Sequence, residues 1–379
     1  MDAQRFAEAV AASGLAGAVG LIGGKDGTRV SAATGRSNSA TGEAMREDHL
    51  FQIASMTKAI ASVAAMQLVE QGRLTLDGPI GDVLPELADI QVIAGFDEAG
   101  VPQLRPAKRP VTLRHLLTHT AGLGYDFISI DQLRARQGTM PEPGSLAAIR
   151  TPLIFDPGER WEYGVNTDWV GLAVEAVNGM KPGGYFQAHL TAPLGVDPTR
   201  LPAQAPAEPR MAAIHTRLPD GSLMQVPMSL GGGEFNSGGG GLSSTGADYM
   251  RFLRMVLNGG TLDGATILSK PSITELCRNQ ISGFPAGRMG STMPELAPPY
   301  DPFPGMECGW SLAFLINPEP GPHGRSAGSL AWAGIFNSYY WIDPVKDVIG
   351  VFLSQHMPFG DAGALAAAGT LERMAYGLD

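Results

Sequence analysis

The sequence predicts an α/β (α+β) protein, in which a central antiparallel sheet flanked by helices is joined to a mostly helical domain. Three observations carry this prediction. Strand patterns gather near the two ends of the 379-residue chain, helical patterns between Pro/Gly loops fill the middle, and 44% of the residues are hydrophobic, which is enough for a large core. We therefore expect a discontinuous α/β domain from residues 1–76 and 220–379, a helical domain with loops from 77–219, and a functional cleft between them.

The N-terminal part contains the patterns of two helices and a hairpin. Residues 3–12 have the apolar spacing of an amphipathic helix, and 16–23 and 28–35 have strand patterns on either side of a Gly-containing turn. Residues 54–71 are apolar at helical spacing, and Gly72 follows them as a C-terminal cap. The expected order is helix, β-hairpin, long helix.

The middle and the C-terminal part differ in residue type. Short helical patterns dominate the middle, whereas from Gly309 onward aromatic and β-branched runs alternate with Pro-containing turns, which is typical of consecutive antiparallel strands. An Ala- and Leu-rich segment ends the chain. The expected elements are helices at 112–118, 167–178 and 183–192, strands at 309–316, 329–342 and 345–355, and a closing helix at 362–376.

The charge balance excludes some classes of partner. The chain has 27 Lys+Arg and 37 Asp+Glu, a formal charge of −10, without a block of basic residues. Such a chain lacks the positive surface that neutralises a phosphate backbone, so no nucleic-acid partner is expected. The N-terminus has no basic segment followed by an apolar run, and no apolar stretch approaches the ~18 residues of a membrane span. We therefore expect a cytoplasmic protein that is not embedded in a membrane.

The residues of common metal and disulfide sites are sparse. Cys277 and Cys308 are the two cysteines, and they lack a CxxC arrangement, which argues against a disulfide scaffold and a cysteine zinc site. His115 and His119 have the spacing of paired metal ligands on a helix, but Leu116 stands where a zinc protease has glutamate. We interpret both histidines as structural and expect neither a metal nor a cofactor.

The strongest candidate nucleophile is Ser55, in the chain's single SxxK motif. Ser55 and Lys58 are three residues apart at the start of the long helix, a spacing that places both side chains on one face. A serine hydroxyl is a poor nucleophile unless a neighbouring group removes its proton, and a lysine that is partly desolvated by apolar neighbours can lose its charge and do so. A helix-capping serine with a solvated lysine is the structural alternative for this tetrapeptide.

A second serine matches a different motif. Ser326 lies in Gly324-Arg-Ser-Ala-Gly328, the GxSxG pattern of the α/β-hydrolase elbow, with Asp343 or Asp347 and then His356 following. The elbow requires a strand before the serine and a helix after it, whereas here a Pro/Gly loop precedes Ser326 and a strand pattern follows. We interpret this segment as a turn that leads into a strand.

A tyrosine supplies a candidate general base. Tyr163 stands in a Gly-flanked turn, within PGERWEYG at 157–164, just before the predicted helix at 167–178. A lysine ammonium favours the phenolate form of a nearby tyrosine, which can then accept a proton near neutrality. A buried aromatic residue with a satisfied hydroxyl is the structural alternative.

These ordered motifs resemble the serine β-lactamase and penicillin-binding-protein superfamily. Within it, the chain is most similar to the family VIII carboxylesterases, which look like class C β-lactamases, and to the fungal polyketide-side-chain acyltransferases. The resemblance implies a β-lactamase-like fold, with Ser55 as nucleophile, Lys58 and Tyr163 sharing proton transfer, and the backbone N–H groups of Ser55 and Ile335 forming the oxyanion hole. The matching segments extend over nearly the whole chain: LLTHTAGL at 116–123, YGVNTDW at 163–169, GGGGLSST at 238–245 and WAG at 332–334.

The third motif departs from that of a true β-lactamase. Trp332-Ala-Gly334 stands where a Lys-Thr-Gly would bind the carboxylate of the drug. Trp332 is neutral and large, so we expect an uncharged or apolar substrate part at this edge. The class C pattern has Asn two residues after the tyrosine, but Val165 occupies that position, and Asn166 is therefore not expected to be catalytic.

The expected activity is that of a serine carboxylesterase, which hydrolyses short- to medium-chain acyl esters through an acyl-enzyme on Ser55. Tyr125, Phe127, Trp332 and Gly334 are the expected substrate-binding residues, and the expected partner is a small-molecule ester. Either Lys58 or Tyr163 is the kinetic base, since a coupled pair titrates as a unit. The alternatives are an acyltransferase that uses the same site, a weak cephalosporin-type β-lactamase, and a non-catalytic binding protein that kept the fold.

Overall fold

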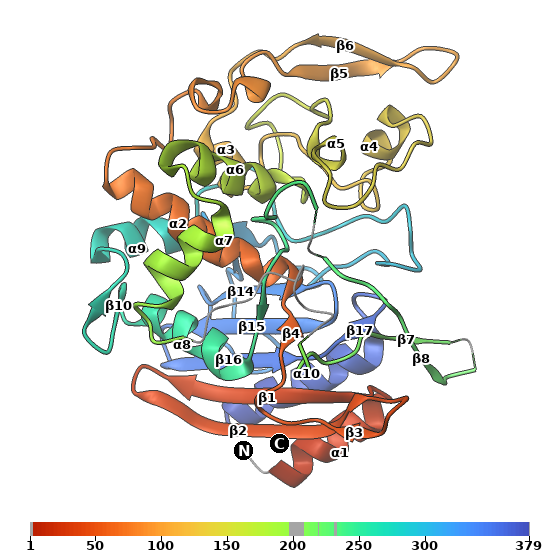
Figure 1. Cartoon of the computed structure of the whole chain (residues 1–379), viewed down its shortest axis with the longest axis vertical. Helices are drawn as coiled ribbons and strands as arrows, with labels where there is room; N and C mark the ends of the chain where they lie inside the picture. Colours follow the sequence, from red (N-terminus) through yellow and green to blue (C-terminus); the bar gives the residue numbers. More distant parts are fainter. Residues whose placement is uncertain (1–2, 197–207, 219, 231–232, 379) are drawn as a thin grey trace.

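The computed structural model describes residues 3–196, 208–218, 220–230 and 233–378 (Figure 1). Its central feature is an eight-stranded sheet in which every pair of neighbours is antiparallel, in the order β12-β13-β14-β15-β16-β1-β2-β3. The sheet therefore joins the two ends of the chain, because β1 lies beside β16. The strands are β1 (Gly17–Gly24), β2 (Gly27–Asn38), β3 (Glu43–Ala44), β12 (Gly309–Trp310), β13 (Leu315–Ile316), β14 (Leu330–Gly334), β15 (Ser338–Asp343) and β16 (Val348–Leu353).

Two of the predicted C-terminal strands are wrong in their extent, because each consists of two shorter strands joined by a turn. The run at 329–342 forms the hairpin β14–β15, and the run at 309–316 forms the short hairpin β12–β13. The first turn is made by Asn337, which adopts a left-handed φ of 58°. The second is closed by Ser311, whose hydroxyl accepts hydrogen bonds from the N–H groups of Ala313 and Phe314. Continuous apolar composition hid both turns, because the residues that turn the chain are themselves buried.

Helices cover the two faces of the sheet. On the outer face, α1 (Ala3–Ser13) and α10 (Ala362–Ala375) pack together and bury Phe6, Trp341 and Phe352. On the inner face, α2 (Thr57–Glu70) and α8 (Gly246–Leu257) pack over Leu21 and Tyr340 (Figure 1). Almost every residue of α2 is buried, which is the behaviour of a helix that is apolar on all sides.

The chain between β3 and β12 contains α2 and α8, and most of its other elements fold over these two helices. It contains the helices that were predicted there, but it also contains the hairpin β5–β6 and strand β7, which were not expected. Its elements, together with their pairing partners from elsewhere, are β5 (Gln91–Phe96), β6 (Pro102–Pro106), α3 (Leu113–Leu117), α4 (Ile130–Ala135), α5 (Leu146–Ile149), α6 (Asn166–Asn178), α7 (Pro182–Phe186), a π-helical turn (Gln187–Thr191), β7 (His215–Arg217), β8 (Leu223–Gln225) and β17 (His356–Met357).

The remaining elements are short and lie around the long helix. A 3₁₀ turn, η1 (Ala54–Met56), precedes α2, and α9 (Lys270–Cys277) packs against it. Small two-stranded sheets are formed by β4 (Phe51–Gln52) with β9 (Ser243–Ser244), and by β10 (Thr261–Leu262) with β11 (Ala265–Thr266). The turns η2 (Ile80–Asp82) and η3 (Pro85–Leu87) follow α2 along the chain.

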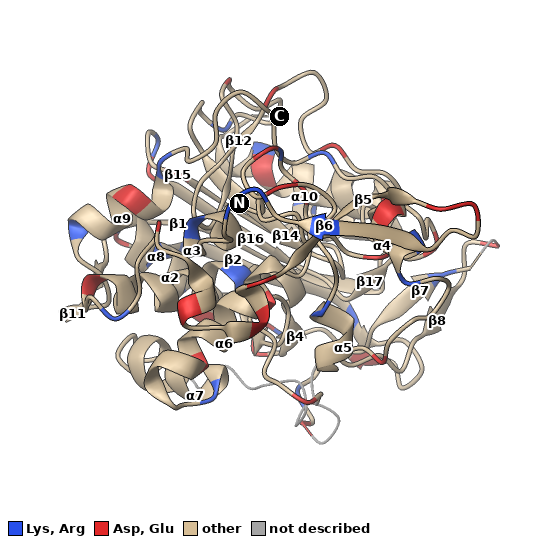
Figure 2. Ribbon diagram, turned by 90° about the horizontal axis from the view of Figure 1, so that it is seen from above, with Lys and Arg blue, Asp and Glu red and all other residues tan. Residues whose placement is uncertain are grey.

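Charged residues of both signs are distributed over many elements of the ribbon (Figure 2). Within the described part of the chain, no helix combines the length and the apolar character needed to cross a bilayer. Among those same residues, no group of three or more His, Cys, Asp or Glu side chains is arranged to hold a metal ion.

Candidate active site

Ser55 lies in the 3₁₀ turn immediately before α2. The residue before it, Ala54, has a left-handed φ of 47°, which is uncommon for a residue with a β-carbon. The turn is closed by a hydrogen bond from the N–H of Met56 to the carbonyl of Ile53. Ser55 is half-buried and lines a cavity of about 730 Å³, so its hydroxyl is accessible to a small molecule.

Lys58 lies one turn further along and is almost completely buried. Its Nζ donates to Ser55 Oγ at 3.3 Å, to Tyr125 Oη at 3.0 Å and to the carbonyl of Gly239 at 2.7 Å. These three acceptors match the three hydrogens of an ammonium group. The geometry therefore accommodates Lys58 as a cation.

The electrostatic surroundings favour the charged form of Lys58. Burial lowers the pKa of Lys58, but the negative charges that Tyr125, Tyr163 and Asp168 can carry raise it by more, and the net pKa lies above its usual value. Burial alone was expected to allow the lysine to lose its proton. Because these groups outweigh burial, the cationic form of Lys58 is favoured.

Tyr163, like Tyr125, lies beside the ammonium group of Lys58. Lys58 Nζ lies 4.9 Å from the centre of the Tyr163 ring, and the phenol oxygen accepts a hydrogen bond of 2.9 Å from Trp332 Nε1. An indole N–H can only donate, so the Tyr163 oxygen is the acceptor in this bond. Such a donor stabilises a phenolate more than a phenol.

Tyr125 is part of the hydrogen-bonded group around Lys58, in addition to lining the cavity. The sequence predicted it only as a substrate-binding residue, whereas its hydroxyl is bonded directly to Lys58. Burial raises the pKa of Tyr125 more than Lys58 lowers it, so its neutral form is favoured. The sequence did contain a signal, because Tyr125 follows the LLTHTAGL motif by only two residues.

Two segments that carry these tyrosines lie in close backbone contact. The N–H of Glu162 donates to the carbonyl of His119, and a β-carbon at Gly164 would lie 2.0 Å from the carbonyl oxygen of Leu123. Only glycine permits this approach. The contact brings Tyr125 and Tyr163 together, with ring centres 5.5 Å apart.

An aromatic cluster supports Tyr163 from behind. His119 packs 4.8 Å from the Tyr163 ring, and Trp310 packs 4.6 Å from Trp332, measured between ring centres. Burial, followed by the charge of Lys58, lowers the pKa of His119 well below its usual value, so the imidazole is neutral. Its Nδ1 is 3.1 Å from Asn166 Nδ2, which also donates to the carbonyl of Leu123. Asn166 thus joins the supporting layer and is not among the residues that line the cavity.

The buried carboxylate of Asp168 holds the loop at Ser237 and Gly239, which also contacts Lys58. Asp168 Oδ1 accepts hydrogen bonds from the N–H of Gly239 at 3.1 Å and from Ser237 Oγ at 2.5 Å. The carbonyl of the same Gly239 accepts from Lys58. Burial raises the pKa of Asp168, and the Lys58 charge opposes that shift. The sequence motifs predict no role for Asp168, although it lies within the YGVNTDW segment.

The other predicted site residues divide into two groups. Phe127, Trp332 and Ile335 line the same cavity as Ser55, Tyr125 and Tyr163. Gly334 does not line it, because its backbone packs against the carbonyl of Ile53, where a β-carbon would lie only 2.5 Å away. Gly334 therefore allows β14 to approach the turn that carries Ser55.

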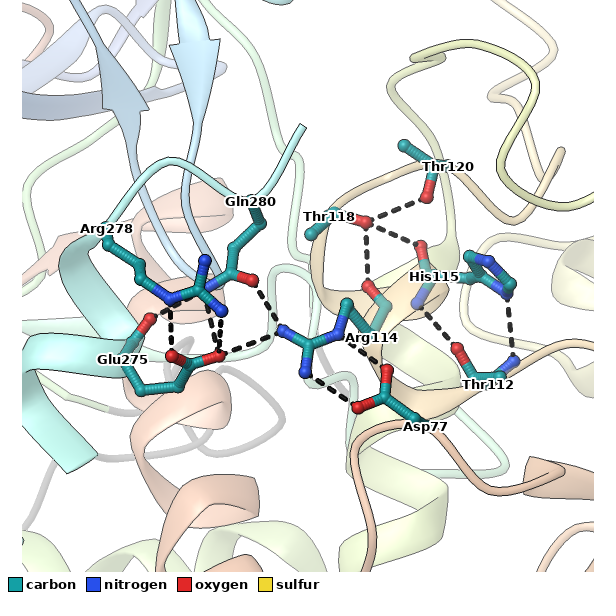
Figure 3. Close-up of polar contacts among 9 residues, drawn as sticks. All are labelled: Asp77, Thr112, Arg114, His115, Thr118, Thr120, Glu275, Arg278 and Gln280. Carbon is teal, nitrogen blue, oxygen red and sulfur yellow. Dashed lines mark hydrogen bonds and ion pairs between the residues drawn. The ribbon is translucent and has the colours of Figure 1, made fainter. Parts of the chain in front are cut away.

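His115 has a structural position. It caps α3, because its N–H donates to Thr112 Oγ1 and its Nδ1 accepts from the Thr112 N–H, each at 3.2 Å (Figure 3). The neighbouring Arg114 bonds Asp77 and Glu275, which connects α3 to α9 (Figure 3). The structure separates His115 from His119, which points into the aromatic cluster.

Ser326 lies in a turn that precedes β14, as the sequence predicted. Its N–H donates to Asp343 Oδ2, and its side chain also bonds this carboxylate. His356 lies 3.7 Å from a different carboxylate, that of Asp361. Among the residues that the structure describes, Ser326 is therefore not joined to a histidine and an aspartate in the hydrogen-bonded series of a catalytic triad.

The comparisons with known proteins agree with this fold. The model of the family described as Beta-lactamase matches residues 3–373. Lovastatin esterase from Penicillium rubens is 33% identical over 339 residues, which cover 84% of this chain and 83% of the relative. Monacolin J acid methylbutanoyltransferase from Aspergillus terreus is 30% identical over 353 residues, which cover 88% and 83%.

A solved structure extends the likeness to three dimensions. A variant of simvastatin synthase from Aspergillus terreus superimposes with a TM-score of 0.84 and 26% sequence identity, covering 99% of this chain and 95% of that one. The sheet and its flanking helices are thus those of a β-lactamase-like fold. The chain belongs to the Beta-lactamase family, a family of serine hydrolases and acyltransferases.

Proposed function

We propose that this protein is a serine carboxylesterase that acts through an acyl-enzyme on Ser55. One observation carries the proposal: Ser55 lines the cavity, and its Oγ lies 3.3 Å from Nζ of the buried Lys58. Tyr125 and Tyr163 lie beside that lysine. A nucleophile within hydrogen-bond reach of the group that controls its proton is the requirement for covalent catalysis. The relatives that include an esterase and an acyltransferase support this reaction class.

Tyr163 is the proposed general base. Its oxygen accepts a hydrogen bond from Trp332, and the Lys58 cation lies near its ring, so both groups favour negative charge on that oxygen. Lys58 also donates to the Ser55 hydroxyl and orients it. Tyr125, in its neutral form, positions the Lys58 ammonium through their shared hydrogen bond.

The reaction proceeds in two balanced halves. Ser55 Oγ bonds to the ester carbonyl carbon while its proton passes to the Tyr163 oxygen, and the N–H groups of Ser55 and Ile335 stabilise the oxyanion, each by about 3 kcal/mol. The bond to the alcohol oxygen then breaks, and that oxygen takes the proton from Tyr163. Water repeats the sequence on the acyl-enzyme, which releases the acid and restores Ser55.

The substrate is proposed to be an uncharged small-molecule ester. Trp332 supplies a neutral indole ring at the position where the resemblance places a lysine in a true β-lactamase, so this residue offers no cation to a carboxylate. Lovastatin esterase is named for an ester substrate, and its likeness to this chain supports the same bond type. Slow β-lactam turnover relative to ester turnover is expected for the same reason.

The test compares the two candidate serines. Ser55→Ala should reduce hydrolysis of p-nitrophenyl butyrate to background, whereas Ser326→Ala should retain it, and intact mass should show an acyl adduct only when Ser55 is present. Full activity of Ser55→Ala, or loss of activity in a folded Ser326→Ala, would show that the proposed nucleophile is wrong.

Acyl transfer is the second candidate function. It is favoured by the 30% identity to a methylbutanoyltransferase and by the superposition on simvastatin synthase. In this case an acceptor alcohol, rather than water, receives the acyl group from Ser55. Adding a panel of alcohols to the esterase assay distinguishes the two: formation of a new ester, at the expense of free acid, identifies a transferase.

A further inference from the structure

The cavity at Ser55 extends beyond the groups that react. Its lining includes Trp332 and Tyr340, which face the inner side of the sheet, and also Ala331, Tyr339 and Trp341, which face the outer side. Successive residues of a strand point to opposite faces. A cavity that touches both sets must therefore pass around the edge of the β14–β15 hairpin.

The strand order explains why this passage exists. Strand β13 pairs with β14 only at Leu330 and Ala331, so it does not extend alongside Trp332 and the two residues after it. On its other side β14 is paired with β15 along its full length. The part of β14 beside Ser55 is consequently a local edge, and Ala333 on this part lines the cavity together with Met289 and Ala297.

The far part of the cavity, called the outer lobe, lies between the sheet and α10. Two alanines on opposite walls leave room there for a ligand that larger side chains would fill. Ala331 belongs to the sheet and Ala368 to α10. The outer lobe is defined by Phe303, Arg325, Ala331, Trp341, Ala368 and Glu372.

Two oppositely charged side chains, Arg325 and Glu372, line the outer lobe, and they neutralise each other. Arg325 and Glu372 form a buried two-point ion pair, with Nε to Oε1 at 2.8 Å and Nη2 bonded to Oε2. The guanidinium also lies over the rings of Phe303 and Trp341, 5.3 and 5.4 Å from their centres. Because the cation is already paired and covered, this pair presents no net charge to the lobe, which suits an uncharged apolar chain.

We propose that the outer lobe binds the apolar chain of a long ester whose carbonyl lies at Ser55. This inference rests on the proposed esterase function and names its substrate class as extended, uncharged esters. The volume of about 730 Å³ falls within the range of about 300–1,000 Å³ for pockets that enclose drug-sized ligands. A butyryl group would leave most of that space to water, whereas each additional buried methylene strengthens binding about fourfold.

The decisive variant is Ala368→Phe, which fills the lobe from α10. Ala366→Phe is the matched control, because Ala366 lies on the exposed side of the same helix and does not line the cavity. The assay measures kcat/KM for p-nitrophenyl esters from acetate to dodecanoate, and for butyrate esters of alcohols of increasing length. The two series distinguish a lobe that holds the acyl chain from one that holds the alcohol chain.

We expect Ala368→Phe to lower kcat/KM about tenfold or more for the longest members of one series and to leave p-nitrophenyl acetate within about twofold of the unaltered protein. Ala366→Phe should match the unaltered protein throughout. An equal response of short and long esters in both series would overturn the proposal. If Ala368→Phe does not fold, Ala331→Leu tests the opposite wall in the same way.

A binding measurement separates this inference from the esterase proposal. Calorimetric titration of Ser55→Ala with the intact dodecanoate ester requires no turnover, and Ala368→Phe in that background should weaken binding about tenfold or more. Retained binding with absent hydrolysis in the unaltered protein would reject the esterase function alone. Unchanged binding on filling the lobe would reject the outer lobe alone.

Discussion

The Nε1 of Trp332 donates a 2.9 Å hydrogen bond to the phenol oxygen of Tyr163. Trp332 was expected to be a neutral pocket wall in place of a substrate-binding cation, and it also lines the cavity. The hydrogen bond adds a second effect, because it stabilises negative charge on the oxygen that is proposed to accept the Ser55 proton. The third motif is thereby connected to proton transfer as well as to substrate selection.

Trp332→Phe should separate these two effects, since it keeps an aromatic ring and removes the donor. A hydrogen bond to a charged group contributes about 1.5–3 kcal/mol, so kcat/KM for p-nitrophenyl butyrate should fall about 10- to 150-fold. An unchanged kcat/KM in a folded Trp332→Phe would show that this bond does not contribute to proton transfer.

Asp168→Asn should change the ionisation of Lys58. The Asp168 charge raises the pKa of Lys58, so its removal should lower that pKa, and the falling limb of the pH profile should move to lower pH. Ser237→Ala is the control, since it removes a hydrogen bond to Asp168 and leaves the charge in place. A shift of the same size in both variants would indicate a loosened loop instead of an electrostatic effect.

Gly164→Ala should disturb the contact between the two tyrosine segments. Its added β-carbon would lie 2.0 Å from the carbonyl oxygen of Leu123, so the backbones must separate. We expect a lower melting temperature together with a loss of esterase activity of about tenfold or more, because the Tyr163 oxygen would be displaced from its position. Gly95→Ala, in β5, has open space around the new methyl group and should leave both measurements unchanged.

The ion pairs that Arg114 and Arg278 form with Glu275 should make the free energy of unfolding depend on pH in the acid range. The hydrogen bond from Arg278, opposed by burial and aided by Arg114, lowers the pKa of Glu275 to about 2 (Figure 3). A lowered folded-state pKa stabilises the protein above the unfolded value of about 4.3, and this contribution disappears as the pH falls toward 2. Urea unfolding should therefore show Arg278→Ala less stable than the unaltered protein at pH 7, with the difference shrinking between pH 4.5 and pH 2.

A difference that stays constant over that pH range would contradict the prediction. It would show that Arg278 stabilises the protein through packing of its side chain and not through the ionisation of Glu275. Esterase activity at pH 7 serves as a further check, because Arg278 is remote from Ser55 in sequence and does not line its cavity. We expect that activity to remain unchanged in the folded variant.

The sequence by itself determined the fold class, the family resemblance and the order of the motifs. Local patterns were sufficient for the helices at 54–71 and 167–178 and for the N-terminal hairpin, because apolar spacing and turn residues are local properties. Ser326 was also interpreted correctly as a turn, since strand and loop patterns around it already excluded an elbow.

Only the tertiary structure decided which side chains meet. Tyr125 and Tyr163 lie together at Lys58 where their two loops touch at Gly164, and Asp168 influences Lys58 through a third segment at Gly239. The charge state of Lys58 follows from these contacts and not from burial alone. Such relations depend on distances of a few ångströms between residues far apart in the chain, and spacing along the sequence contains no measure of them.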